Sequence, residues 1–342
     1  MKKLQQNDFM NYRFLAGLRL NPAGTKAAFT VSQADEKENG YNSCLYLLEN
    51  DEIRQLTSIG KERSFYWEDD ETILFPAVRS KAEQDRAKSG DSFTSFYRLS
   101  LKGGEALPAF TLNFGVSSLR PIGEGRYILT GRIHKDKPDF YLEDEDARKA
   151  SLKEKKDNKD YEVLTETPFW FNGAGYTDGN RTAMFLYDAG KNECIRLTDP
   201  LFNVSQIEVI DGKIYYTGMV QKTVSETYNH LYCMDLESRE VSEIFNHTDL
   251  MISHFEKVEG GYFFIGSKHE RHGNNENPMG YFYHPETDEL TLVWENEEST
   301  HNSVGSDCRL GSGRSTIWFE NELYFATTRG GNGVIHKVNA KG

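Results

Sequence analysis

The sequence predicts an all-β fold, a β-propeller of four-stranded blades in which about six blades are visible and the last one is incomplete. Aromatic residues make up 13% of the 342 residues. They lie in short runs that Gly, Asn and Asp interrupt, which is typical of strands and turns. One strand–turn–strand unit recurs about every 50 residues, and a second hairpin precedes it. Two hairpins per repeat make a four-stranded sheet, and such sheets pack radially because each needs a neighbour to cover its apolar faces.

The recurring unit is an apolar strand with an aromatic pair, a polar turn, and a second strand that closes on Leu-Thr or a similar pair. Its six copies occupy residues 44–57, 95–108, 183–198, 230–245, 280–294 and 334–342. The aligned positions are Tyr46, Tyr97, Phe185, Tyr232, Phe282 and His336, which are separated by 51, 88, 47, 50 and 54 residues. A β-sandwich is the competing fold, but it does not explain these near-regular spacings.

The preceding hairpins are clearest at residues 18–31, 65–75 and 207–216. Polar residues and Gly stand at their turns, as in Asn21-Pro22-Ala23-Gly24 and Asp211-Gly212. Each hairpin pair therefore completes one blade.

The 88-residue interval contains a charge-dense stretch at residues 143–160. We expect a solvated helix or loop inserted within one blade. A hidden additional blade is the alternative, since Phe140-Tyr141-Leu142 lies halfway across the interval, but nothing after it resembles a returning strand. Residues 1–342 are therefore expected to form a single propeller domain.

The last unit stops at Asn339-Ala340-Lys341-Gly342, where its turn should lie, so its returning strand is missing. Either Met1 to Leu15 supplies the missing strand or the chain is a fragment. An unpaired sheet edge invites pairing with another chain. We therefore expect a homo-oligomer that forms through the open propeller edge.

The charge balance excludes several partners. The formal net charge is −13, whereas nucleic acids and anionic membranes need a cationic face. The N-terminus lacks the apolar region of a secretory signal, and no apolar run approaches the ~20 residues that span a bilayer. The four cysteines, Cys44, Cys194, Cys233 and Cys308, have no metal or disulfide spacing, so we expect reduced thiols and a cytoplasmic protein.

No cofactor or metal is expected. His269 and His272 lie in a polar turn region and lack the helical spacing of a zinc peptidase. The acids from Glu143 to Asp146 lack the Gly-punctuated spacing of a calcium loop.

Three segments together resemble the N-terminal propeller of the prolyl oligopeptidase family, in its branch of acylaminoacyl and dipeptidyl-aminopeptidase-like enzymes. The most telling is Thr167-Pro-Phe-Trp-Phe-Asn-Gly-Ala-Gly-Tyr-Thr-Asp178 with the strand and Leu197-Thr198 closure that follow. The segments Leu20-Asn-Pro-Ala-Gly-Thr-Lys26 and Ile53-Arg-Gln-Leu-Thr57 are similar to the family's recurrent turn and closing strand. The resemblance covers essentially the whole chain.

The resemblance implies a propeller that caps a C-terminal α/β-hydrolase domain and admits short peptides to it. That domain carries a serine in a Gly-x-Ser-x-Gly turn. The nearest strings here, around Ser92, Ser117 and Ser315, all lack the closing Gly. We therefore expect the hydrolase domain to be absent from this chain, and the chain to be inactive as a peptidase on its own.

Asp307 and Arg309 lie in a Gly/Ser-rich stretch between blades, where loops face a substrate or a partner domain. The arginine is a candidate to bind a substrate carboxylate or carbonyl, with a structural salt bridge as the alternative. Asp178 and Arg181 are candidates of the same kind, with local turn stabilisation as the alternative. The acids Glu68 to Glu71 have a precedent in the propeller glutamates that hold a peptide amino terminus, but they stand at a hairpin turn, where acids simply favour solubility.

Two other functions stay open. A stand-alone propeller that binds a protein or a small ligand, as TolB-like modules do, is the main alternative. An enzyme that works in its own central channel would need convergent His, Arg or carboxylate groups on the innermost strands, and the repeats reveal none.

Overall fold

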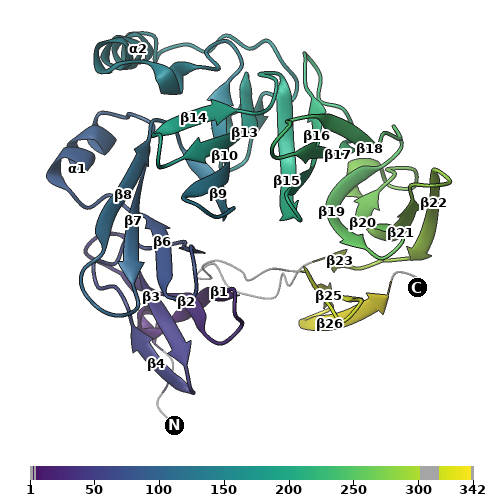
Figure 1. Cartoon of the computed structure of the whole chain (residues 1–342), viewed down its shortest axis with the longest axis horizontal. Helices are drawn as coiled ribbons and strands as arrows, with labels where there is room; N and C mark the ends of the chain where they lie inside the picture. The colour runs from purple at the N-terminus through teal and green to yellow at the C-terminus, as the bar shows by residue number, and fades with distance from the viewer. Residues whose placement is uncertain (1–2, 4, 301–315, 340–342) are drawn as a thin grey trace.

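The computed structural model describes residues 3, 5–300 and 316–339, and these residues form six four-stranded antiparallel sheets around a common axis (Figure 1). We number the sheets as blades 1 to 6 in chain order. Blade 1 comprises β1 (Phe14–Leu20), β2 (Ala27–Asp35), β3 (Gly40–Glu49) and β4 (Glu52–Gln55). Blade 2 comprises β5 (Tyr66–Trp67), β6 (Thr72–Pro76), β7 (Thr94–Ser100) and β8 (Leu107–Leu112). Blade 3 comprises β9 (Val116–Pro121), β10 (Arg126–His134), β13 (Asn180–Asp188) and β14 (Glu193–Arg196).

The second half of the ring repeats the pattern. Blade 4 comprises β15 (Phe202–Ile210), β16 (Lys213–Val220), β17 (His230–Asp235) and β18 (Val241–Phe245). Blade 5 comprises β19 (Met251–Val258), β20 (Gly261–Ser267), β21 (Met279–His284) and β22 (Glu289–Trp294). Blade 6 comprises β23 (Ser299–Thr300), β24 (Thr316–Phe319), β25 (Glu322–Arg329) and β26 (Asn332–Asn339). The predicted all-β propeller of six blades is confirmed.

The alignment of the repeats is also visible in the sheets, because all six aligned residues lie on the third strand position of their blade. Each is paired across the sheet with a large side chain on the second strand. Four of the pairs are stacked rings with centroids 5.2–6.2 Å apart, namely Phe29–Tyr46, Phe75–Tyr97, Tyr216–Tyr232 and Phe325–His336. Cross-strand aromatic pairs of this kind stabilise a sheet. The recurrence in the sequence is therefore the recurrence of one cross-strand contact.

Apolar cores join neighbouring blades. One cluster, for example, combines Ile128 and Met184 of blade 3 with Val204 and Ile214 of blade 4. The other clusters join blades 1 and 2, blades 2 and 3, blades 4 and 5, and blades 5 and 6. No cluster within the described ranges joins blade 6 to blade 1.

The facing sides of blades 6 and 1 carry exposed apolar side chains instead. Leu15 and Leu20 of β1 are 67% and 63% exposed, and Ile317, Phe319 and Ile335 of blade 6 are 53%, 57% and 79% exposed. We call this junction between blades 6 and 1 the seam.

Blade 6 differs from the other blades in its strand positions. β26 pairs with β25 along the whole of β25, so β23 and β24 must share the other side of that strand. The described strands therefore fill three positions across this sheet, as the prediction of an incomplete last blade requires.

Phe14 and Leu15 belong to β1 and pair with β2. The described part of the N-terminal segment thus supplies no strand to blade 6, contrary to one of the two expectations for ring closure.

The remaining elements are inserted between strands of the blades. Helix α1 (Lys81–Lys88) lies between β6 and β7, and helix α2 (Glu145–Asp157) with the short strands β11 (Trp170–Phe171) and β12 (Gly175–Tyr176) lies between β10 and β13. Single-turn 3₁₀ helices occupy Asp8–Asn11, Phe140–Leu142 and Gly273–Asn275. Because β10 and β13 are paired directly, residues 135–179 interrupt one blade and add none. None of the described helices has the length and apolar character of a membrane span.

Candidate functional site

The connections of the propeller are distributed unequally between its two faces. Successive strands of a blade run antiparallel, so the connections between second and third strands all emerge on one face, which we call the loop face. The first-to-second connections on the opposite face have two to six residues. On the loop face, blades 2 to 5 carry residues 77–93, 135–179, 221–229 and 268–278. Binding residues concentrate on long loops held by a rigid scaffold, so a binding site is expected on the loop face.

Residues 161–179, which we call the strap, cross from blade 3 towards blade 4 on this face. The strap is anchored by Glu166, whose side chain is fully buried. Arg181 donates to both Glu166 carboxylate oxygens at 3.0 and 2.5 Å, and Lys135 donates to one of them at 2.8 Å. Burial alone would raise the pKa of Glu166, but the hydrogen bonds from Arg181, Lys135 and the Gly179 N–H outweigh it and lower that pKa to about 2. Glu166 is therefore a carboxylate at every physiological pH.

The structure gives Arg181 and Asp178 scaffold contacts. The Arg181 guanidinium has no exposed surface, and it also donates to the backbone carbonyls of Asn180, Leu201 and Gln221. Asp178 accepts hydrogen bonds from the backbone N–H groups of Thr165 and Glu166 at 2.9 and 2.7 Å. These contacts favour the local stabilisation that the sequence offered as the alternative to substrate binding. Asp307 and Arg309 lie outside the described residues.

The strap is paired with the loop of blade 4. The Thr167 N–H donates to the Thr223 carbonyl at 2.8 Å, and the Ser225 N–H donates to the Thr167 carbonyl at 2.9 Å. Beyond this contact the strap turns into the hairpin of β11 and β12, in which Trp170 pairs with Tyr176. Trp170, Phe171 and Tyr176 are 50%, 51% and 53% exposed. A well-anchored base thus presents aromatic side chains to solvent.

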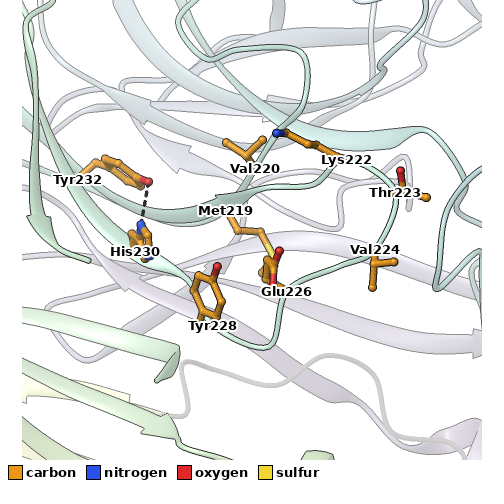
Figure 2. Close-up of a pocket in the computed structure, with 9 residues that line it drawn as sticks. All are labelled: Met219, Val220, Lys222, Thr223, Val224, Glu226, Tyr228, His230 and Tyr232. Atoms are coloured by element: carbon orange, nitrogen blue, oxygen red, sulfur yellow. Dashed lines mark hydrogen bonds between the residues drawn. The ribbon is translucent and has the colours of Figure 1, made fainter. Parts of the chain in front are cut away.

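A cavity of about 540 Å³ lies beside this contact at the end of blade 4 (Figure 2). Its wall is formed by Met219, Val220, Lys222, Thr223, Val224, Glu226, Tyr228, His230 and Tyr232. His230 Nδ1 lies 2.8 Å from a carboxylate oxygen of Glu243 and 3.3 Å from the Tyr232 hydroxyl. His230 Nε2 is buried and has no hydrogen-bond partner among the described residues. The ring of Tyr228 stacks on His230 with the centroids 5.5 Å apart.

The His230 cavity provides binding groups and lacks a paired nucleophile. Glu243 fixes the ring of His230, and burial together with Glu243 raises the pKa of Tyr232, so the phenol stays protonated. Among the described residues, His230 forms no hydrogen bond to a Ser, Thr or Cys side chain. The cavity therefore offers polar groups beside aromatic rings in one wall. Sequence reasoning missed His230, because its partner Glu243 lies 13 residues away on the next strand.

Among the described residues, two other histidines lie close to a hydroxyl group. His269 lies near Ser267, and His336 lies near Thr327. Ser267 Oγ lies 3.4 Å from His269 Nδ1, but it donates to Glu276, and the same Nδ1 lies 2.9 Å from the Gly273 carbonyl. A nitrogen that donates to a carbonyl carries a proton and cannot act as a base. Thr327 lies 2.7 Å from His336 Nε2 but is 1% exposed. Neither geometry is that of an accessible nucleophile and its base.

The inner strands carry charges that the repeats did not reveal. Arg120 of β9 lies 4.0 Å from Glu208 of β15, and His254 and Glu256 of β19 are 2.9 Å apart. Each of these side chains therefore already has a partner within the wall of the ring. The part of the chain that the structure describes contains no group of three His, Cys, Asp or Glu side chains arranged to hold a metal ion.

Comparison with known proteins finds similar folds among solved structures. No family model and no curated protein matches the sequence. Among solved structures, Pyrococcus horikoshii acylaminoacyl peptidase matches with a TM-score of 0.65 and 14% identity, over 99% of this chain and 47% of that chain. The β-propeller domain of the trilobed protease from Pyrococcus furiosus matches with a TM-score of 0.55 and 12% identity, over 96% of this chain and 83% of that chain.

A similar fold also occurs in an enzyme that is not a peptidase. An oligogalacturonate lyase in complex with manganese matches with a TM-score of 0.55 and 11% identity, over 94% of this chain and 75% of that chain. Our chain spans about half the length of the acylaminoacyl peptidase that it matches. The chain is thus a six-bladed β-propeller whose fold is similar to the matched part of that peptidase and to the propeller domain of the trilobed protease.

Proposed function

We propose that this chain is the propeller part of a serine peptidase of the prolyl oligopeptidase kind, and that it admits short peptides to an α/β-hydrolase domain that carries the catalytic serine. One observation carries the proposal. Nearly the whole chain, 99% of it, matches 47% of an acylaminoacyl peptidase, so the other half of such a peptidase is available for the catalytic chemistry. We infer that this chain filters by size, because a ring whose blades pack against one another at five of six junctions admits a short peptide more readily than a long polypeptide or a folded protein.

The loop face supports docking of a hydrolase domain. Trp170, Phe171 and Tyr176 are about half exposed on a hairpin whose base is held by the buried ion pair of Glu166 and Arg181. Exposed aromatic side chains on a rigid base are typical anchors of protein interfaces. We therefore place the hydrolase domain against the β11–β12 hairpin. A reducing compartment such as the cytoplasm fits the free thiols of Cys44, Cys194 and Cys233.

The proposal is tested by assaying this chain alone and together with a hydrolase domain encoded in the same reading frame or beside it. We expect the chain alone to give no turnover of N-acetyl-alanine p-nitroanilide and no labelling by a serine-directed fluorophosphonate. We expect it to co-elute with the hydrolase domain in gel filtration. Fluorophosphonate-sensitive turnover by the chain alone, or a hydrolase domain that ignores the chain, would contradict the proposal.

A second candidate is a propeller that binds a ligand on its own. The His230 cavity favours it, because that cavity offers a buried imidazole nitrogen without a described partner beside stacked aromatic rings. The discriminating observation is genetic. A Gly-x-Ser-x-Gly hydrolase domain in frame supports the peptidase, and its absence from both the reading frame and the neighbouring genes supports the binding module.

A further inference from the structure

A second cavity on the loop face, of about 490 Å³, is built from blades 2 and 3 and helix α2. Residues 90–92, the end of β10, the inner side of α2 and Tyr176 of the strap form its wall. The charged residues of the wall are Arg132, Lys137, Arg148, Lys155, Asp91 and Glu143, with His134 beside them. Four cations therefore face two carboxylates, in a chain whose net charge is −13. We call this cavity the cationic cleft.

Two of the four cations are already compensated. Arg148 is bound to the Asp91 carboxylate, and it donates to the Ser92 and Asn113 carbonyls at 2.9 and 3.1 Å. Lys137 is paired with Glu154 at 2.9 Å. Within the part of the chain that the structure describes, the Arg132 guanidinium and the Lys155 ammonium form no hydrogen bond or ion pair. Both side chains are exposed, so a ligand can reach them.

The uncompensated cations indicate an anionic ligand, because guanidinium and ammonium groups bind carboxylates and phosphates through charge-assisted hydrogen bonds. The rest of the wall narrows the class. Phe140, Leu152 and Tyr176 give the cleft an apolar side, which an inorganic anion would leave uncovered. Glu143 lies in the same wall and disfavours a second negative charge on the ligand. A single carboxylate attached to an apolar group satisfies all three features.

We propose that the cationic cleft binds the C-terminal carboxylate of a short peptide, with Arg132 and Lys155 on the carboxylate and Tyr176 and Leu152 against the terminal side chain. A volume of about 490 Å³ accommodates two or three residues. The choice of a peptide rests on the proposed function, whereas the anion site rests only on the cleft. The propeller would in this way hold the C-terminal part of a substrate, which becomes the amine leaving group when the serine attacks.

The test measures binding to this chain alone, so its outcome is independent of peptidase activity. Calorimetry compares N-acetyl-alanyl-alanyl-phenylalanine with its C-terminal amide and with inorganic phosphate. We expect the free acid to bind about tenfold more tightly than the amide, since only the acid pairs with the two cations. Arg132→Gln and Lys155→Gln should each reduce this preference to about threefold or less, without changing the thermal unfolding midpoint, because both side chains are exposed.

Lys153→Gln is the matched control, because Lys153 is an exposed cation on the same helix that does not line the cleft. It should keep the full preference for the acid. Equal binding of acid and amide would overturn the proposal, as would Arg132→Gln and Lys155→Gln variants that behave like the control. If phosphate binds as tightly as the acid and displaces it, the cleft is a phosphate site and the proposal of a peptide ligand is wrong. If the hydrolase domain fails to associate but the acid preference holds, the proposed function fails and the anion site stands.

Discussion

Glu166 is the residue on which the strap depends, because it joins Arg181, Lys135 and the Gly179 N–H in one buried cluster. We predict that Glu166→Gln lowers the free energy of unfolding by about 3 kcal/mol at pH 7, since it leaves the buried Arg181 uncompensated. Urea denaturation measures this change. Glu162→Gln is the control, an exposed acid on the same strap, and should have little effect. A Glu166→Gln variant as stable as the control would contradict the assigned role.

The same carboxyl predicts a pH dependence. The pKa of Glu166 falls from 4.5 in the unfolded chain to about 2 in the folded chain. Its contribution to stability is therefore fully present above pH 4.5 and is lost as the pH falls through about 2, and it amounts to about 3 kcal/mol. The stability difference between the wild type and Glu166→Gln should accordingly shrink when urea denaturation is repeated at pH 3. A difference that stays constant from pH 7 to pH 3 would mean that the ionised carboxylate is not the stabilising group.

Single residues also show where sequence reasoning stops. The charged Arg181 was visible as a candidate, but its partner Glu166 lies 15 residues earlier across a hairpin, and no local spacing signals that contact. A lone arginine in a Gly-rich segment is compatible with both a ligand and a structural partner. Only the fold shows that five acceptor contacts already occupy it.

At the scale of elements, neighbouring strands of one blade lie too close together for a side chain at certain glycines. A Cβ atom on Gly261 of β20 would lie 2.2 Å from the Tyr283 carbonyl oxygen of β21, which is backbone and cannot turn away. We predict that Gly261→Ala destabilises the protein by about 2 kcal/mol, measured by thermal or urea unfolding. Gly331→Ala is the matched control, because nothing lies within 4 Å of its Cβ position, and it should be close to neutral. Equal stability of the two variants would show that β20 and β21 are spaced more widely.

The β11–β12 hairpin is the element that we expect to touch the hydrolase domain. Trp170→Ala should leave the unfolding midpoint nearly unchanged, because the ring is 50% exposed. It should weaken association with the hydrolase domain by about tenfold or more, as loss of an aromatic interface anchor does. Gel filtration or calorimetry measures the association. Ile53→Ala, which removes a 64% exposed apolar side chain from the outer strand of blade 1, should bind normally. If both variants associate equally well with the hydrolase domain, the interface lies on another part of the chain.

Element prediction from the sequence succeeded where one contact recurs and failed where it does not. The aromatic residue on each third strand made the blades countable, because its cross-strand partner requires the same spacing every time. The first strand of blade 3, Val116–Pro121, has no such marker. The strap and its hairpin carried no periodic signal either, since they stabilise themselves through long-range contacts with Arg181 and with the loop of blade 4.

At the scale of the whole molecule, the seam is the weakest junction of the ring. Each other pair of neighbouring blades shares an apolar core, whereas the described residues of blades 6 and 1 share none. We predict that backbone amides of β25 and β26 exchange with deuterium faster than those of β20 and β21, which are covered on both faces. Exchange followed by mass spectrometry measures this. Equal protection of both blades would mean that the seam is packed.

The exposed apolar side chains at the seam also bear on association. Ile317, Phe319 and Ile335 belong to a sheet whose described strands fill three positions, and such an exposed apolar surface and open edge favour self-association. We predict that light scattering shows the molar mass rising with protein concentration. A monomer at every concentration would contradict a homo-oligomer formed through the seam.

The central claim is that this ring selects substrates for a catalytic serine housed in another domain. The most direct test measures kcat/KM of the hydrolase domain, with and without this chain, on an acetylated tripeptide nitroanilide and on a long unfolded polypeptide such as casein. We predict that adding the chain keeps or raises turnover of the tripeptide and suppresses turnover of casein by about tenfold or more. An unchanged ratio of the two rates would contradict it.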